Sequence, residues 1–245
     1  MNSPASSALD QLLAKVSQLV DRIESVLPQP LSAPDWSQAI AWRYRKRSSG
    51  HGVLEPVRHV AAMTLDDLQE IDQQKEKLQR NTEQFVNGRP SNNVLLTGAR
   101  GTGKSSLIKA CLNSYAAQGL RLIEVDKADL TDLPDIIEVV ASRPEKFIVY
   151  CDDLSFEDGE VHPGEGVEEK ISLSERFGLW ISFYPFSQDE YLTIAGQWLS
   201  ALGATPAQIE GARADALLWA LERGSRSGRV AYQFARDFMG RQAAA

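Results

Sequence analysis

The chain has 245 residues, of which 43% are hydrophobic and 24% charged, as in globular proteins of one or two domains. It has no run of about 18 apolar residues and no secretory signal order at its N-terminus, so we expect a soluble, cytoplasmic protein without membrane contact. The net charge of −7 argues against polyanion binding by the whole surface, and the distant Cys111 and Cys151 argue against a disulfide framework or a zinc site.

Helices are expected in the N-terminal part of the chain. Apolar residues recur at helical spacing over residues 8–27, and Pro28 ends this pattern. A second helix is predicted over residues 34–47, where Pro34 and Asp35 favour a first turn. The two are interpreted as an N-terminal helical extension over residues 1–57.

The rest of the chain shows a third helical pattern and then alternating elements. The third helix is predicted over residues 64–85. After it, short apolar runs alternate with helical segments, which predicts an α/β fold with a parallel sheet covered by helices on both faces. After Ser187 the pattern is helical throughout. The expected strands are 94–97, 120–125, 147–151 and 179–184, and the expected later helices are 133–142, 188–202, 206–223 and 229–241.

The segment GARGTGKS, from Gly98 to Ser105, matches the P-loop pattern G-x-x-x-x-G-K-[ST] between a strand and a helix. Its glycines let successive N–H groups and the helix N-terminus point at phosphate oxygens. Lys104 supplies charge to the β- and γ-phosphates, and Ser105 places a hydroxyl where magnesium would bind. The alternative is a glycine-rich turn without a ligand. The expected nucleotide-binding residues of this segment are Gly98, Ala99, Arg100, Gly101, Thr102, Gly103, Lys104, Ser105 and Ser106.

A pair of acids follows the apolar strand at 147–151, in the order that a Walker B sequence has after a P-loop. Asp152 is expected to hold magnesium through water, together with Ser105, and Asp153 to orient the attacking water. The alternative is that both acids only begin a solvated turn. The expected cofactors are therefore ATP and Mg²⁺.

Through these motifs, the chain resembles the AAA+ class of P-loop ATPases, and within it the bacterial DUF815 family of ATP-binding proteins. The resemblance depends on residues 92–110 around the P-loop, on CDDLSFE at 151–157 and on LSERFG at 173–178. It implies a P-loop module with a helical lid, and it implies that residues 60–71 match the linker that covers the adenine in AAA+ proteins.

The resemblance also implies roles for two arginines. Arg176 is similar in position to the arginine finger that AAA+ proteins present to a neighbour's γ-phosphate, which implies a homo-oligomer. The alternative for Arg176 is an ion pair with Glu169 or Glu175 on a solvated surface. Arg229 looks like the sensor-2 arginine of the lid. The alternatives are that Arg226 has this role, or that both arginines are ordinary surface residues.

One departure from the AAA+ pattern lies between the Walker B acids and Arg176. AAA+ modules have a helix and a central strand there, and that strand ends in the sensor-1 residue; here only residues 154–175 intervene, too few for a helix, a crossover and a strand. We therefore expect the family segment to be missing near Glu160 and Val161. Its loss would leave a gap in the middle of the sheet and would weaken hydrolysis more than phosphate binding.

A basic stretch with interleaved aromatic residues, Arg43–Arg47, allows a second kind of partner. It could contact nucleic acid phosphates and stack bases, although a solvated face or a protein-docking surface is the more usual role of such a stretch.

These expectations give one overall prediction. The N-terminal extension covers residues 1–57, a three-layer P-loop α/β domain covers 58–186, and a helical lid covers 187–245. The expected function is Mg-ATP binding with weak hydrolysis, acting on an unknown client. Its alternative is a non-catalytic module whose partner affinity responds to nucleotide. The expected catalytic residues are Lys104, Asp152, Asp153 and Arg176.

Overall fold

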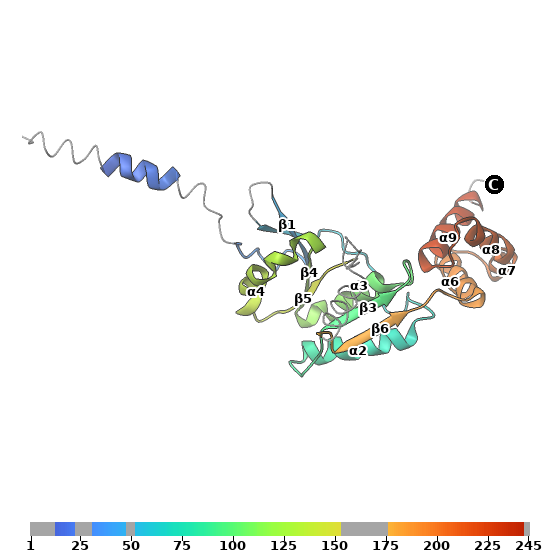
Figure 1. Ribbon diagram of the computed structural model, residues 1–245. Coiled ribbons are helices and arrows are strands. Elements are labelled where there is room, and N and C mark those ends of the chain that lie inside the picture. Colours follow the sequence, from blue (N-terminus) through green and yellow to red (C-terminus); the bar gives the residue numbers. More distant parts are fainter. Residues whose placement is uncertain (1–12, 23–30, 48–51, 153–175, 243–245) are drawn as a thin grey trace, which may run out of the picture.

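The computed structural model describes residues 13–22, 31–47, 52–152 and 176–242. Within these ranges it forms a mixed α/β body followed by a group of C-terminal helices (Figure 1). The expected α/β class with parallel strands is confirmed. Residues 13–22 are helical and exposed, in agreement with the first predicted helix, whose two ends lie outside the described residues. No helix in the described ranges is both long and apolar enough for a membrane crossing.

The predicted helix over 34–47 is wrong, because this part of the chain forms a β-strand. Strand β1 (Ala41–Lys46) pairs antiparallel with β2 (Gly52–Pro56) and parallel with β4 (Leu120–Glu124). Trp42 and Tyr44 are buried, whereas Arg43 and Arg45 point outward, so the pattern has the two-residue period of a half-buried strand. The sheet therefore begins inside the expected N-terminal extension.

The first sheet has, in the part of the chain that the structure describes, four strands in the order β2-β1-β4-β5, and β5 (Lys146–Tyr150) pairs parallel with β4. One face carries a core of aromatic and branched side chains under α4 (Leu133–Ala141), including Trp42, Ile123 and Ile136. The other face packs against α3 (Lys104–Tyr115) through Leu112 and Tyr115. Helices on both faces give this sheet the expected three layers. Short 3₁₀ helices, Ala116–Gln118 and Lys127–Asp132, flank β4.

Within the described ranges the second sheet has two strands, β3 (Val94–Gly98) and β6 (Leu179–Phe183), which pair in parallel. Among the described residues β3 and β5 have no strand between them and do not pair with each other. The expected loss of a central strand concerns residues 154–175, which lie outside the described ranges, so the gap between these two strands stays a prediction. Helix α3 bridges the two sheets, because its Leu107, Ala110 and Cys111 belong to the core under β6.

Helix α2 (Asp72–Val86) lies against α3 and β6 but is shorter than predicted. The expected helix began at Thr64, whereas the observed one begins at Asp72. Glu70 has a φ angle of 63°, and this left-handed conformation interrupts any helix that would enter from residue 64.

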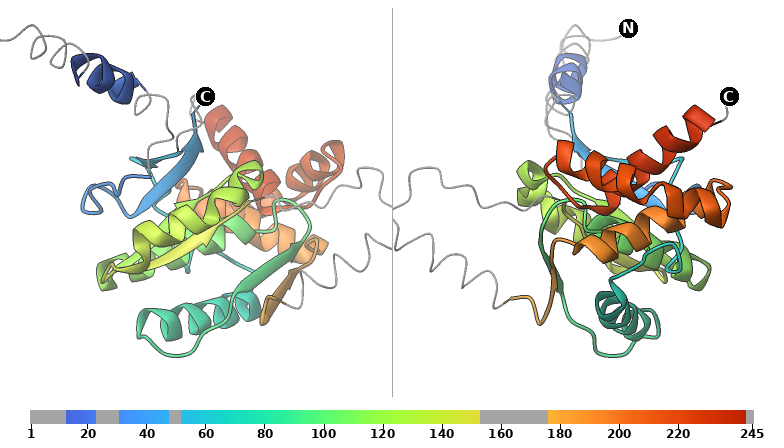
Figure 2. Two further views of the ribbon diagram at one scale, coloured as in Figure 1. Left: turned by 60° about the vertical axis from the view of Figure 1, so that its left-hand side comes forward. Right: turned by 90° about the vertical axis from the view of Figure 1, so that its right-hand side faces the viewer.

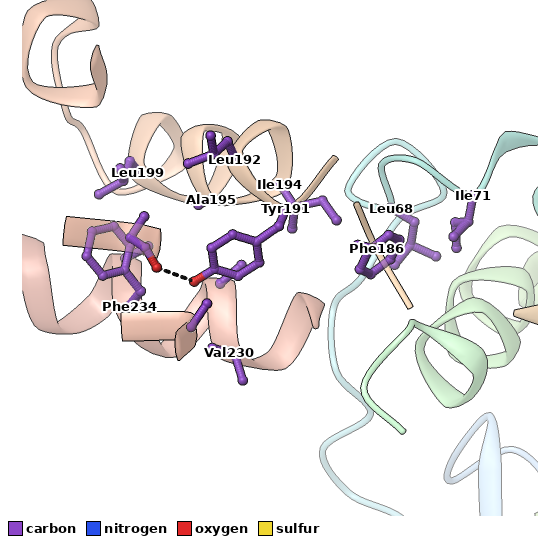
Figure 3. Packing of buried hydrophobic residues seen from close by; sticks show 14 of the residues in the cluster. Leu68, Ile71, Phe186, Tyr191, Leu192, Ile194, Ala195, Leu199, Val230 and Phe234 are labelled. Carbon is purple, nitrogen blue, oxygen red and sulfur yellow. Dashed lines mark hydrogen bonds between the residues drawn. The ribbon is translucent and has the colours of Figure 1, made fainter. Parts of the chain in front are cut away.

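The C-terminal part is helical, as expected, and its helices gather beside the sheets (Figures 1 and 2). Ser187 caps the first of them in a capping box with Glu190. Buried side chains of the first and last helices pack together, and the Tyr191 hydroxyl donates a hydrogen bond to the Ala216 carbonyl at 3.1 Å (Figure 3). The predicted helix over 206–223 is divided at Ala212. The four helices are α6 (Gln188–Ala201), α7 (Pro206–Gly211), α8 (Arg213–Glu222) and α9 (Gly228–Gln242).

Candidate functional site

The glycine-rich loop joins β3 to α3 and depends on left-handed backbone conformations. Gly98, Gly101 and Gly103 have φ angles of 113°, 76° and 101°, in the region that favours glycine. At Gly98 a Cβ atom would also collide with the Phe183 carbonyl of the neighbouring strand. The sequence therefore needs glycine at this position both for the sharp turn and for the close pairing with β6.

Lys104 is the first residue of α3 and lies over this loop. Its Nζ donates hydrogen bonds to the carbonyl oxygens of Gly98 at 2.8 Å and Ala99 at 2.7 Å. The buried Thr102 hydroxyl donates to the same Ala99 carbonyl at 2.8 Å. The ammonium group is thus held inside the loop, where it can exchange carbonyl oxygens for the oxygens of a phosphate.

Ser105 and Asp152 lie together, although they follow strands of two different sheets. Ser105 Oγ donates to the two carboxylate oxygens of Asp152 at 3.3 and 3.2 Å. A hydroxyl and a carboxylate are the hard oxygen donors that Mg²⁺ takes, usually with phosphate and water oxygens completing its six ligands. No group of three or more His, Cys, Asp or Glu side chains suited to a metal occurs within the described part of the chain. Asp153 lies outside the described residues.

Tyr150 is a member of this site that the sequence analysis did not select. It ends β5, is 9% exposed, and its Oη is buried without a hydrogen-bond partner among the described residues. Burial raises the pKa of this hydroxyl, while the neighbouring Ser105 lowers it and Asp152 raises it. In the sequence, the feature that could have identified it is a tyrosine at the end of an apolar run, two residues before the first acid.

Helix α9 begins against the glycine-rich loop. The Gly228 N–H donates to the Gly101 carbonyl at 2.9 Å, and the buried Ser227 caps α9 by accepting from the Val230 N–H at 3.3 Å. Arg229 is the second residue of α9. A Cβ atom added to Gly101 would lie 3.6 Å from the Cβ of Arg229. Arg226 is exposed in the loop before the helix. The structure therefore brings Arg229 next to the P-loop.

Arg176 lies far from this loop within the same chain. β6 runs parallel to β3, so Leu179 is beside Val94 and Phe183 is beside Gly98. Arg176 is exposed and precedes Leu179, which puts it beyond the opposite end of a five-residue strand that spans roughly 17 Å. It is not brought together with Lys104 or Ser105. Its alternative partners, Glu169 and Glu175, lie outside the described residues.

An apolar group borders the loop on the side of the expected adenine linker. Leu68, Ile71 and Phe186 are buried and lie together (Figure 3). Ile71 Cδ1 would be 3.3 Å from a Cβ on Gly103, so this group adjoins the P-loop. Asn113 of α3 fixes the linker by donating to the carbonyls of Ala61 at 2.9 Å and Met63 at 2.8 Å. Phe186 was not among the predicted site residues.

The structure argues against base stacking by the basic stretch at residues 43–47. Trp42 and Tyr44 are buried in the core, so they cannot stack on bases. The cationic side chains pair with acids: Arg43 with Glu124 at 2.7 Å, Lys46 with Asp132 at 2.9 Å, and Arg45 and Arg47 with Glu55 at 3.5 and 3.6 Å. This surface is largely charge-compensated.

Comparisons with known proteins place this geometry in context. A family model described as "Protein of unknown function (DUF815)" matches residues 37–161 and 157–242. The two matches overlap at residues 157–161, which include the position where a missing family segment was expected. No curated protein matches the chain.

Three solved structures of RuvB from Thermotoga maritima are similar to the chain. An alanine-to-serine mutant is 16% identical, with 72% of this chain and 64% of that chain covered and a TM-score of 0.49. A threonine-to-valine mutant is 18% identical, with the same coverage and a TM-score of 0.45. The RuvB Holliday junction branch migration motor is 16% identical, with 74% and 72% covered and a TM-score of 0.40. The chain thus spans slightly less than two thirds of the first two structures.

Proposed function

We propose that this chain, which belongs to the DUF815 family, binds Mg-ATP at the P-loop and hydrolyses it slowly. The observation that carries this proposal is the contact between Ser105 and Asp152 at 3.2 Å. The contact joins the helix after the P-loop to the end of a strand in a separate sheet. A sequence that needed only a turn after β5 would not require this pairing of a hydroxyl with a carboxylate across two sheets.

The proposed roles follow from the positions of the side chains. Loop N–H groups and Lys104 would hold the phosphates, and Ser105 and Asp152 would hold magnesium. When bound, magnesium would neutralise charge on the phosphate oxygens. Asp153, which directly follows Asp152, would orient the attacking water.

Two arginines complete the proposed assembly. Arg229 would contact the nucleotide from the lid, because α9 begins against Gly101. Arg176 would act on the site of a neighbouring subunit, since it lies beyond the opposite end of its own strand. We propose the division at residues 187–245 for the lid, whereas β1 and β2 join the sheet of the nucleotide domain.

A second candidate function is a nucleotide-responsive interaction module that does not turn over ATP. Two observations favour it. β3 and β5 are not joined by a central strand among the described residues, and an AAA+ module would carry its sensor-1 residue on that strand. The hydrogen bond between Gly228 and Gly101 also gives the lid a direct contact with a loop that would rearrange on binding phosphate.

Equilibrium binding of ATP and ADP beside single-turnover hydrolysis separates these functions. Wild-type protein should bind both nucleotides, and Lys104→Ala should lose tenfold or more in affinity, on the order of one charge-assisted hydrogen-bonding group. Lys109→Ala, on the same helix, is the control and should bind normally. Tight binding without phosphate release would favour the interaction module. If neither nucleotide raises the melting temperature, the proposed function is wrong.

A further inference from the structure

Tyr150 occupies a position in which its hydroxyl has no evident structural purpose. The ring belongs to the core between the four-stranded sheet and α3, and the residue is 9% exposed. Within the described residues the buried Oη makes no hydrogen bond, although it lies against Ser105 of α3 and Asp152. Phenylalanine would fill this space equally well. Because buried polar groups are normally hydrogen-bonded, the hydroxyl indicates a second arrangement in which it has partners.

Ser105 and Asp152 can supply those partners. In this structure Ser105 donates its proton directly to Asp152. An Asp152 oxygen that turns toward a cation or its water ligands is lost to the Ser105 proton, which then needs a different acceptor. Tyr150 Oη is the neighbouring acceptor, and its own proton can then go to the Asp152 carboxylate. The resulting chain runs from Ser105 through Tyr150 to Asp152, and every hydroxyl in it is satisfied.

We propose that Tyr150 is a positioning residue for magnesium at the nucleotide site, which rests on the proposed Mg-ATP binding. Its hydroxyl accepts the Ser105 proton and donates to Asp152, so that the lone pairs of Ser105 face the cation. This role requires a neutral phenol. A tyrosine hydroxyl ordinarily keeps its proton at neutral pH.

The test is the Tyr150→Phe variant of the full chain, with ADP affinity measured by titration calorimetry in excess Mg²⁺ and in EDTA. The variant should bind ADP as wild type does in EDTA but lose about threefold to tenfold in affinity with Mg²⁺, the range expected for one hydrogen bond. Its melting temperature without nucleotide should be unchanged or higher, because the removed hydroxyl has no hydrogen-bond partner among the described residues.

Tyr115→Phe is the matched control, since Tyr115 is a buried tyrosine of the same core cluster. It should leave the effect of Mg²⁺ on ADP affinity unchanged. The inference is overturned if Tyr150→Phe keeps the full wild-type Mg²⁺ effect, or if it loses affinity equally in EDTA, which would indicate a purely structural role. Binding by wild type that does not respond to Mg²⁺ would also overturn it but would leave nucleotide binding intact. If wild type binds no nucleotide in either buffer, the proposed function itself fails, and this inference fails with it.

Discussion

Replacing Gly101 with alanine should loosen the contact between the P-loop and the lid helix α9. Gly101 has a φ angle of 76°, and this left-handed conformation costs an alanine about 1–2 kcal/mol. The new Cβ would also lie 2.8 Å from Ser227 Oγ and 2.9 Å from Ser227 Cβ. Overpacking of this kind costs about 1–3 kcal/mol. The free energy of unfolding should therefore fall by about 2–5 kcal/mol.

Gly88→Ala separates the two contributions. Gly88 has a φ angle of 70°, but no atom lies within 4 Å of the Cβ that alanine would add, so only the backbone cost of about 1–2 kcal/mol is expected. Ser227→Gly removes the obstructing side chain, and a cap changed to glycine costs only a few tenths of a kcal/mol. In that background Gly101→Ala should cost no more than Gly88→Ala.

The coupling between positions 101 and 227 comes from urea unfolding, followed by circular dichroism, of wild type, Gly101→Ala, Ser227→Gly and the double variant. We expect a coupling of about 1–3 kcal/mol, equal to the overlap that Ser227→Gly relieves. The reasoning is refuted if Gly101→Ala destabilises no more than Gly88→Ala. It is also refuted if Ser227→Gly leaves the cost of Gly101→Ala unchanged, because α9 would then not meet the loop through this contact.

Three further predictions test other parts of the structure. Trp42→Ala should lower the free energy of unfolding by about 3–5 kcal/mol in urea unfolding, because Trp42 is 0% exposed; a cost below 1 kcal/mol would argue that β1 is not part of the core. Arg176→Ala should leave ATP affinity unchanged but remove any rise of specific ATPase activity with protein concentration. A loss of ATP affinity in the monomer would contradict the position of Arg176 at the end of β6 that lies away from the P-loop. Burial raises the pKa of the Cys111 thiol to about 11, so iodoacetamide at pH 8 should modify the less buried Cys151 first. Mass spectrometry of the modified protein gives the order of reaction, and the reverse order would contradict the packing.

Local motifs account for what the sequence could predict about the site. The P-loop is a contiguous run whose glycines and Lys104 act through their own backbone and side chains, so its position between β3 and α3 follows from the pattern. The acid after β5 is similarly local. The prediction of a gap between β3 and β5 is local as well, because it depends on the number of residues in 154–175, too few for another helix and strand.

Tertiary pairing accounts for what the sequence did not predict. Pro34 and Asp35 resemble a helix start, yet the alternation of Trp42 and Tyr44 with arginines becomes decisive only because β4 pairs with this segment. The role suggested for Tyr150 requires the end of β5 to lie beside the first turn of α3. This contact joins two segments that follow strands of different sheets. Neither contact has a signature within a short window of sequence.

Calorimetric titration of ATP into wild-type protein and Asp152→Ala, in Mg²⁺ and in EDTA, tests the central claim most directly. Mg-ATP binding at the P-loop predicts that wild type binds ATP more tightly in Mg²⁺ than in EDTA. It further predicts that Asp152→Ala loses this difference while its affinity in EDTA remains that of wild type. The account is contradicted if wild type takes up no ATP, or if Asp152→Ala retains the full effect of Mg²⁺.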